Sequence, residues 1–113
     1  MTIPTIEVID APSPFCPVFQ ATLELVGRRW SGAIIRSLMA GRVRFSDVLA
    51  DILGLSDRLL SERLRELEGR GLIARSVFAE TPVRIEYQLT QKGRDLDAVV
   101  HAIDAWGAKW ADT

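Results

Sequence analysis

The sequence predicts a mainly helical domain that carries a single β-hairpin, and two observations support this fold class. Residues 45–75 hold two amphipathic helical patterns separated by Gly54-Leu55-Ser56. Residues 72–89 then hold two β-prone runs on either side of Glu80-Thr81-Pro82, which is turn material. A short helix, a tight turn, a longer helix with a charged outer face and a following two-stranded wing together make a winged helix-turn-helix.

The composition is that of one ordinary soluble domain. The 113 residues are 48% apolar and 26% charged, which is enough for a hydrophobic core. No apolar run approaches the ~20 residues of a membrane span, and the start of the chain lacks the pattern of a secretory signal, so we expect a cytoplasmic protein. The net charge of −1 and the pI of about 5.8 neither prove nor exclude DNA binding, which depends on local placement of cations.

Reactive and metal-binding side chains are few, since the chain has one cysteine, Cys16, and one histidine, His101. A single cysteine cannot form an intrachain disulfide, and no metal-ligand spacing such as HExxH or CxxC occurs. We therefore expect no metal and no cofactor, and interpret His101 as an ordinary surface or interface residue of a helix.

The N-terminal region divides into an arm and a first helix. Residues 1–14 are expected to form a flexible arm, because prolines recur there and no hydrophobic period is sustained. Residues 15–113 are expected to form the folded domain. Pro17 suits the first position of a helix, which makes Cys16 its N-cap and leaves Phe15 just outside it.

The next two helices complete the entry to the helix-turn-helix. Gly27 ends the first helix, and Arg28-Arg29-Trp30 is expected to begin the second, which stops at Ala40-Gly41. Ser46 is expected to cap a third helix over residues 47–53. Four apolar side chains of that helix are expected to face the core: Val48, Leu49, Ile52 and Leu53.

The second helix of the motif, the recognition helix, is expected over residues 57–70 with Ser56 as its cap. Leu60, Leu64 and Leu67 recur at i, i+4 and i+7 and bury one stripe. The opposite face carries four polar side chains: Arg58, Ser61, Glu62 and Arg65.

The chain closes with the wing and a long amphipathic helix. The wing is expected over residues 72–89, and Thr90 is expected to cap a last helix over residues 91–111. The apolar stripe of that helix either packs within the chain or forms a homodimer contact with the first helix, and we favour the homodimer because the stripe is long for a compact core. The residues expected in the interface are Phe15, Val99, Ile103, Trp106 and Trp110.

Several short segments, in order from about Cys16 to Trp110, carry a family resemblance. They include Cys16-Pro17, Gly27-Arg28-Arg29-Trp30, Arg44-Phe45-Ser46-Asp47, Leu64-Arg65-Glu66-Leu67-Glu68, Gly71-Leu72-Ile73 and Pro82-Val83-Arg84-Ile85-Glu86-Tyr87. With them the chain resembles the HxlR-type family of winged helix-turn-helix transcriptional regulators, which are relatives of the MarR superfamily. The resemblance implies a homodimeric repressor or activator with its N- and C-terminal helices at the dimer interface. It also implies that the N-terminal cysteine senses electrophiles, aldehydes or oxidants, as in many members.

The recognition helix supplies the candidate base contacts. Arg58 and Arg65 are the candidates, because an Arg can hold guanine O6 and N7 bidentately, worth ~1–3 kcal/mol against a wrong base. The alternative is a solvated face on which Glu62 pairs with them, worth only ~0.2–0.5 kcal/mol per pair. Ser61 and Ser56 are candidate phosphate donors, although Ser56 can be occupied as a cap.

Three arginines outside the recognition helix are further candidates. Arg84 of the wing is placed to reach the minor groove or a phosphate, and the alternative is a pair with Glu80 or Glu86. Arg42 and Arg44, which precede the helix-turn-helix, are phosphate candidates.

Cys16 is the candidate sensor. A thiol at a helix N-terminus can have its pKa lowered, because the dipole and the free N–H groups favour the thiolate. A thiolate near solvent would react with electrophiles, or with its symmetry mate to give an intersubunit disulfide. The alternative is a small buried hydrophobe. A pocket between the last helix and the wing domain is a second candidate, for a small aromatic effector.

The leading function is therefore a dimeric DNA-binding transcriptional regulator on a pseudo-palindromic operator. Its two recognition helices would lie about 34 Å apart in successive major grooves. The alternative is a winged-helix module that binds protein and not DNA, which the acidic pI and Glu62, Glu66 and Glu68 support. An enzyme is the weakest class, because one Cys and one His far apart do not establish a catalytic cleft.

Overall fold

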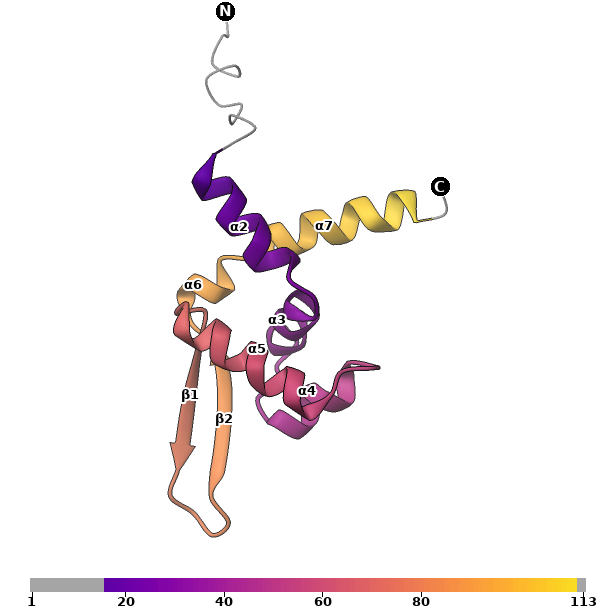
Figure 1. Cartoon of the computed structure of the whole chain (residues 1–113). Coiled ribbons are helices and arrows are strands. Elements are labelled where there is room, and N and C mark those ends of the chain that lie inside the picture. The colour runs from indigo at the N-terminus through magenta and orange to yellow at the C-terminus, as the bar shows by residue number, and fades with distance from the viewer. Residues whose placement is uncertain (1–15, 112–113) are drawn as a thin grey trace, which may run out of the picture.

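The structure, a computed structural model, describes residues 16–111. Their elements are α2 (Pro17–Gly27), α3 (Ser31–Met39), α4 (Phe45–Asp51), α5 (Asp57–Gly69), β1 (Ile73–Phe78), β2 (Arg84–Leu89), α6 (Gln91–Arg94) and α7 (Asp97–Trp110). In Figure 1 the helices α3, α4 and α5 form a compact body beside the hairpin, and α7 projects from that body away from the hairpin tip. The chain is a mainly helical winged helix-turn-helix with a two-stranded hairpin. The arm expected over residues 1–14, and Phe15, lie outside the described residues.

One hydrophobic core holds the helix-turn-helix to the wing. Helix α5 buries Leu60, Leu64 and Leu67 almost completely, which confirms the stripe expected from their spacing. The side chains that pack against this stripe come from α3, α4 and the start of the hairpin. Those that are nearly fully buried are Ile34, Ile35, Val48, Leu72 and Ile73. None of the helices within the described part of the chain is long and apolar enough to cross a bilayer.

The wing is an antiparallel pair whose register runs from Ile73 opposite Leu89 to Phe78 opposite Arg84. The outer edge of β2 is anchored to the link between α3 and α4, because the Tyr87 N–H donates to the Val43 carbonyl at 2.8 Å. This bond fixes the hairpin beside the helix-turn-helix.

The expected start of the second helix is wrong, since α3 begins at Ser31 and not at Arg28. Trp30 has φ 77°, so residues 28–30 form a turn with one residue in the left-handed region. Such a backbone costs a non-glycine residue of order 1–3 kcal/mol and persists where packing holds it. Packing does so here, because the Trp30 ring lies against the helix-turn-helix at Gly54, where an added Cβ would come within 3.3 Å of it.

The expected limits of the third helix are also wrong. Helix α4 starts at Phe45 with Arg44 at its N-cap, so Ser46 lies inside the helix and does not cap it. The helix ends at Asp51, and Ile52 adopts an extended backbone. After the helix ends, helical spacing no longer predicts which side chains face the core. Leu53 was expected in the core and is 98% exposed. Val48 is buried, as expected.

The expected last helix is two helices. Thr90 caps α6, since its hydroxyl accepts from the Gly93 N–H at 3.2 Å, as expected. Helix α6 is held tightly against the start of the hairpin, where a Cβ on Gly93 would meet the Leu72 carbonyl oxygen at 2.1 Å. The Leu96 N–H then bonds to the Gly93 carbonyl, which tightens the last turn before α7 leaves in its own direction.

Candidate nucleic-acid interface

The N-terminus of α5 has the features of a recognition helix. Ser56 is the N-cap and its hydroxyl accepts from the Leu59 N–H at 3.2 Å, which confirms its expected capping role. Asp57 lies in the first turn, where the helix dipole favours a carboxylate. The hydroxyl of Ser56 thus has its acceptor role filled, and keeps a proton for a phosphate.

The outer face of α5 contains one paired arginine and one free arginine. Arg58 is 89% exposed in its side chain, and its Nε lies 3.1 Å from Glu62 Oε2. The solvated pair, which the sequence left as an alternative, is therefore present for Arg58. Arg65 is exposed on the same helix and, within the described part of the chain, makes no ion pair and no side-chain hydrogen bond.

A hollow of about 310 Å³ lies between α5 and the hairpin. It is lined by Ser61, Leu64, Arg65, Glu68, Arg75 and Tyr87. It therefore brings Ser61 and Arg65, both expected on the DNA face, next to Arg75 of β1, which the site prediction missed. The strand register explains why Arg75 lies there. Arg75 is paired with Tyr87 across the hairpin, so the two side chains lie on the same face of the sheet, and both line the hollow.

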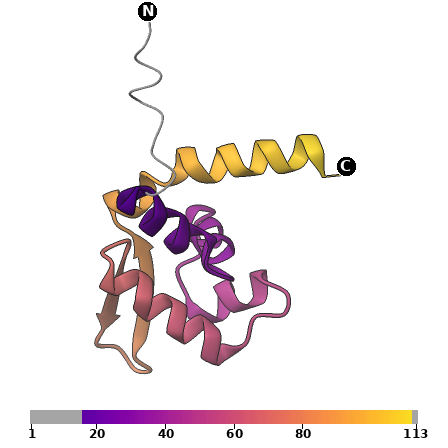
Figure 2. The same ribbon diagram turned by 45° about the horizontal axis from the view of Figure 1, so that its top comes forward.

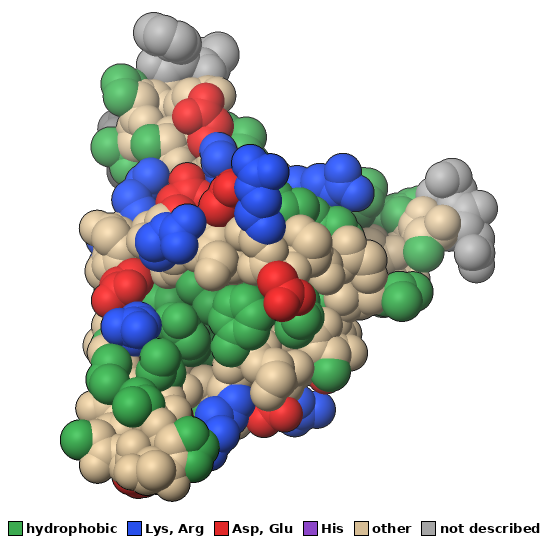
Figure 3. Space-filling view, turned by 60° about the horizontal axis from the view of Figure 1, so that its bottom comes forward, with side chains coloured by type: hydrophobic (Ala, Val, Ile, Leu, Met, Phe, Trp, Pro, Cys, Tyr) green, Lys and Arg blue, Asp and Glu red, His purple; other side chains and the backbone are tan. Residues whose placement is uncertain are grey.

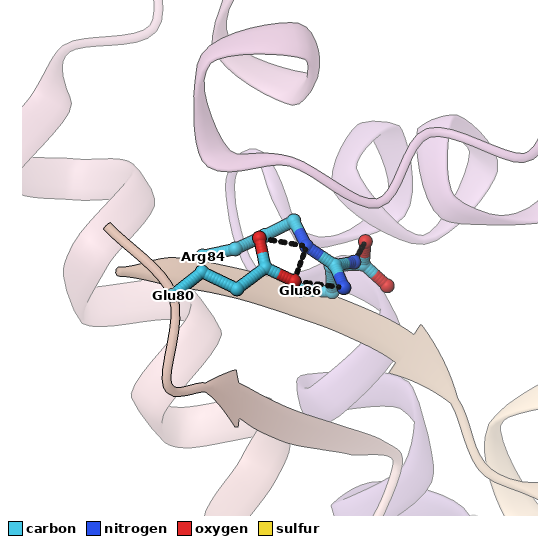
Figure 4. A network of polar contacts seen from close by, with 3 residues as sticks. All are labelled: Glu80, Arg84 and Glu86. Carbon is cyan, nitrogen blue, oxygen red and sulfur yellow. Dashed lines mark hydrogen bonds and ion pairs between the residues drawn. The ribbon is translucent and has the colours of Figure 1, made fainter. Parts of the chain in front are cut away.

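Arg84 is held between two carboxylates of the wing (Figure 4). Its guanidinium lies 2.9 Å from Glu80 Oε2, pairs also with Glu86, and stacks 3.9 Å from the centre of the Phe78 ring. The hydrogen bonds from Arg84 hold the pKa of Glu80 below its ordinary value, with Arg44 adding a weaker attraction. The hydrogen bonds that Arg84 donates to Glu80, and then those to Glu86, raise the pKa of Arg84. The alternative interpretation, a pair within the wing, is observed with both carboxylates.

The two arginines before α4 differ in the same way. Arg42 pairs with Asp51, with Nε 3.4 Å from Oδ2, and Asp51 also accepts from the Ser37 hydroxyl at 2.9 Å. Arg44 is exposed at the N-cap of α4, close enough to the wing for its charge to act on Glu80. Arg44 therefore remains available to an anion, whereas Arg42 must first leave Asp51.

The charged side chains on the lower face of the molecule are mixed and not uniformly basic. Figure 3 shows Lys and Arg side chains next to Asp and Glu side chains around a hydrophobic band. This arrangement agrees with the net charge of −1 and with the ion pairs above. The positive potential that DNA would meet comes from a few unpaired arginines.

The turn before α3 is bonded to α5. Arg28 Nε forms an ion pair with Glu66 Oε1 at 3.0 Å. The angle at this contact does not suit a hydrogen bond. Arg63 Nε donates to the Arg29 carbonyl at 3.0 Å. Together with the contact of Trp30 on the helix-turn-helix, these bonds connect the end of α2 to the recognition helix.

Cys16 is half-buried at the N-cap of α2, as expected from Pro17, and is a free thiol. The Gln20 N–H donates to its carbonyl at 2.9 Å, which begins the helix. Within residues 16–111 no three His, Cys, Asp or Glu side chains come together in an arrangement that could hold a metal ion.

Helices α2 and α7 carry large exposed apolar side chains. Neither helix has a buried residue, and α7 projects away from the body in both ribbon views (Figure 2). On α7 the exposed residues are Val99, Ile103, Trp106 and Trp110, and on α2 they are Val18, Phe19 and Leu23. The start of the apolar stripe packs partly against the core through Leu96 and Val100, whereas the rest of the stripe on α7 stays exposed.

A second hollow, of about 440 Å³, lies between α3, β2 and the start of α7. Its lining includes Met39, Arg42, Tyr87, Arg94 and Asp97. This is the position expected for an effector pocket between the last helix and the wing domain.

Comparison with known proteins agrees with this architecture. The family model for the HxlR-like helix-turn-helix matches residues 25–113. The chain is 44% identical over 100 residues to the uncharacterised HTH-type transcriptional regulator YvaP of Bacillus subtilis, which covers 88% of this chain and 93% of YvaP. It is 40% identical over 97 residues to the HTH-type transcriptional regulator YodB of the same organism, covering 86% and 87% of the two chains.

Solved structures of two regulators superpose on the fold. The reduced form of YodB gives a TM-score of 0.77 at 40% identity, covering 87% of this chain and 96% of that one. Quinone-bound YodB gives 0.73 at 36% identity, with 85% and 100% covered. The redox regulator HypR in its reduced form gives 0.79 at 33% identity, with 86% and 95% covered.

A winged helix-turn-helix with an exposed recognition helix defines a transcriptional regulator of the HTH type. The chain belongs to the HxlR-like helix-turn-helix family, as its residues indicated. Its relatives are transcriptional regulators, which confirms the expectation that it is not an enzyme.

Proposed function

We propose that the protein acts as a homodimer that binds a pseudo-palindromic operator in the cytoplasm and releases it when a reactive compound or a small effector is sensed. The observation that carries this proposal is the outer face of α5, which carries Arg58, Ser61 and Arg65, with the last two beside the wing. The two recognition helices of the dimer would enter successive major grooves, about 34 Å apart.

The operator contacts divide into base readers and phosphate ligands. Arg65 reads a guanine, because its fork is exposed and has no partner among residues 16–111. Arg58 reads a second base after releasing Glu62, and the pair it loses is worth only ~0.3–0.5 kcal/mol because both side chains meet solvent. Ser56, Ser61 and Arg44 fix the position of the protein on phosphates. Arg84 shapes the wing in the free protein and reaches DNA only if its carboxylate partners release it.

The dimer is supported by the apolar side chains that the chain leaves uncovered. Trp106 is 69% exposed and Ile103 57% exposed, which is unusual for large apolar residues one turn apart on a helix. A symmetry mate that packs α2 and α7 against their counterparts would cover them. The expected interface residues are Val99, Ile103, Trp106 and Trp110, with Phe15 outside the described residues.

Cys16 is the proposed sensor. It lies at the start of α2, a helix proposed for the interface, and the turn after α2 is bonded to α5 through Arg28 and Arg29. An electrophile such as a quinone adds to the thiolate without an external oxidant. Diamide instead removes two electrons and two protons from two thiols, which join as a disulfide while diamide becomes the hydrazine. The relative YodB has solved structures in a diamide-treated and a quinone-bound form, which supports this chemistry.

An electrophoretic shift assay across a salt series tests DNA binding. On an operator selected from random duplexes, log affinity is expected to fall linearly with log salt, with a slope of about −0.9 per phosphate contact. The second candidate function is a module that binds another protein, which the mixed charge of Figure 3 supports. If the protein binds none of the duplexes in a salt-sensitive manner, the protein-binding function is favoured over DNA binding.

The sensing proposal has its own test. Low diamide or an aldehyde is expected to lower operator affinity in the wild type, and Cys16→Ser is expected to bind DNA normally without that response. A response that persists in Cys16→Ser would remove this thiol from the mechanism and leave the hollow beside Tyr87 and Arg94 as the effector site.

A further inference from the structure

The arginines of the described chain fall into two sets. Several of them are neutralised by a carboxylate: Arg28, Arg36, Arg42, Arg58 and Arg84. Arg65 and Arg75 are different, because within residues 16–111 neither side chain has an ion pair or a hydrogen bond. These two unpaired arginines line the same hollow between α5 and the hairpin. Two unneutralised cations on one concavity identify a place for an anion.

We propose that this hollow seats one phosphodiester phosphate of the operator backbone, with Arg75 of β1 as its main cation and the Ser61 hydroxyl as a second donor. The proposal rests on the DNA-binding mode proposed above. It adds a DNA contact from Arg75 on β1. The sequence had offered Arg84 as the contact from the wing.

The hairpin side of the hollow, where Arg75 lies, suits a backbone phosphate, and Arg65 lies on the α5 side that the proposed binding mode assigns to a base. Ser61 and Arg65 come from α5, which enters the major groove, and Arg75 comes from the hairpin, which lies outside it. A DNA strand must therefore cross between the two elements, and this crossing is where the hollow lies. The guanidinium fork of Arg75 matches two phosphate oxygens, and a serine hydroxyl can donate to a third contact point.

Leu64 and Tyr87 form the inner wall of the hollow. Leu64 is buried to 1% exposure and Tyr87 is half-buried, so the inner wall of the hollow is protein and not solvent. Arg65, Glu68 and Arg75 themselves are exposed, so a phosphate held here would stay in contact with solvent and its binding would depend on salt. Arg75 also stands in the middle of the strand register, opposite Tyr87, so its Cα is fixed by the hairpin.

Glu68 is the opposing feature of the same hollow. Its carboxylate makes no ion pair with Arg65 or Arg75, since none is found within 4 Å in the described chain. It would therefore repel the phosphate, so that the site binds DNA less tightly than its two arginines alone would. The proposal thus makes opposite predictions for two side chains of one hollow.

The test measures operator affinity and its salt dependence for single variants, by fluorescence anisotropy on the selected operator and on a scrambled duplex. Arg75→Ala is expected to reduce the slope of log affinity against log salt by about 0.9 and to weaken binding about eightfold at 0.1 M salt, which is the counterion release of one phosphate contact. The loss is expected on both duplexes, with base preference unchanged. Arg75→Lys keeps the charge and is expected to keep the slope.

Two further variants keep the test decisive. Glu68→Gln is expected to raise affinity several-fold on both duplexes. Arg36→Gln removes one positive charge from α3, where the guanidinium faces Asp104, and is expected to leave the slope unchanged. A thermal melt of each variant checks that the fold is intact.

The outcomes separate the two proposals. If the wild type binds with a salt slope and Arg75→Ala keeps that slope, the phosphate site is refuted and the DNA-binding function stands. A loss in Arg75→Ala on the operator alone also refutes it, because a residue that reads bases would act that way. If the wild type binds no duplex in a salt-dependent manner, both proposals are refuted together.

Discussion

Replacing Glu62 with Gln tests why an acidic residue lies on the face that should meet DNA. In the free protein Glu62 holds Arg58 at 3.1 Å, with the two side chains 39% and 89% exposed. An exposed i, i+4 pair of this kind contributes about 0.3–0.5 kcal/mol. If Arg58 must leave Glu62 to reach a base, that energy is lost on binding, and it lowers affinity about twofold, since 1.4 kcal/mol is tenfold. Glu62→Gln is therefore expected to raise affinity about twofold on every duplex.

The assay is anisotropy with the selected operator and a scrambled duplex at one salt concentration. Glu24→Gln is the matched control, because it removes a carboxylate from α2, where Glu24 accepts from Gln20. In an Arg58→Ala background the gain from Glu62→Gln is expected to disappear, because no pair remains to be released. A drop of tenfold or more on the operator alone would refute the reasoning. It would show that Glu62 accepts a hydrogen bond from a cytosine amino group and reads that base.

Three further predictions concern the fold, the wing and the dimer. Gly93→Ala is expected to destabilise the domain by about 1–3 kcal/mol in chemical denaturation, because its Cβ would collide with backbone, whereas Gly69→Ala has open space and is expected to gain up to about 1 kcal/mol. The folded-state pKa of Glu80 is depressed, so its bond to Arg84 is fully present above the ordinary carboxyl pKa of 4.5 and is lost as the pH falls through the lower folded value. The protection of the hairpin amides, measured relative to the intrinsic exchange rate at each pH, is thus expected to be constant between pH 5 and 8 and to fall in stronger acid, and Glu80→Gln should remove that fall. Trp106→Ala is expected to weaken dimerisation by about 2 kcal/mol or more, roughly thirtyfold, in sedimentation equilibrium, and an unchanged dimer would remove α7 from the interface.

The sequence predicted the elements that depend on local chemistry. The leucine stripe of α5, the cap at Ser56 and the cap at Thr90 follow from short-range rules, and the structure has all three. The hairpin follows from alternation on both sides of a turn. These signals lie within a few residues of the feature they specify.

Errors arose where distant packing decides the local backbone. Trp30 leaves the helical region because its ring packs near Gly54, which is far away in the sequence. Leu53 has the spacing of a core residue, yet the helix ends two residues earlier and turns it to solvent. The break before α7 depends on the close approach of Gly93 to Leu72, which no period reveals.

The sequence indicates which residue types stand on the candidate site, but it does not show which of its arginines are paired with carboxylates. The residue pattern only selected candidate arginines for a DNA interface. Arg84, for which a DNA contact and a pair with Glu80 or Glu86 were both open, is paired with both carboxylates in the structure, whereas Arg75 was not selected and is unpaired within residues 16–111. Pairing depends on side-chain geometry across a hairpin, which sequence spacing describes poorly.

Operator spacing tests most directly whether two recognition helices act together in one dimer. Affinity is measured for the selected operator and for versions with about half a helical turn, ~5 base pairs, inserted between its half-sites. The account predicts that the insertion reduces affinity to that of a single half-site, because the second α5 then faces the wrong side of the duplex. Equal affinity for the original and the lengthened operator would contradict it.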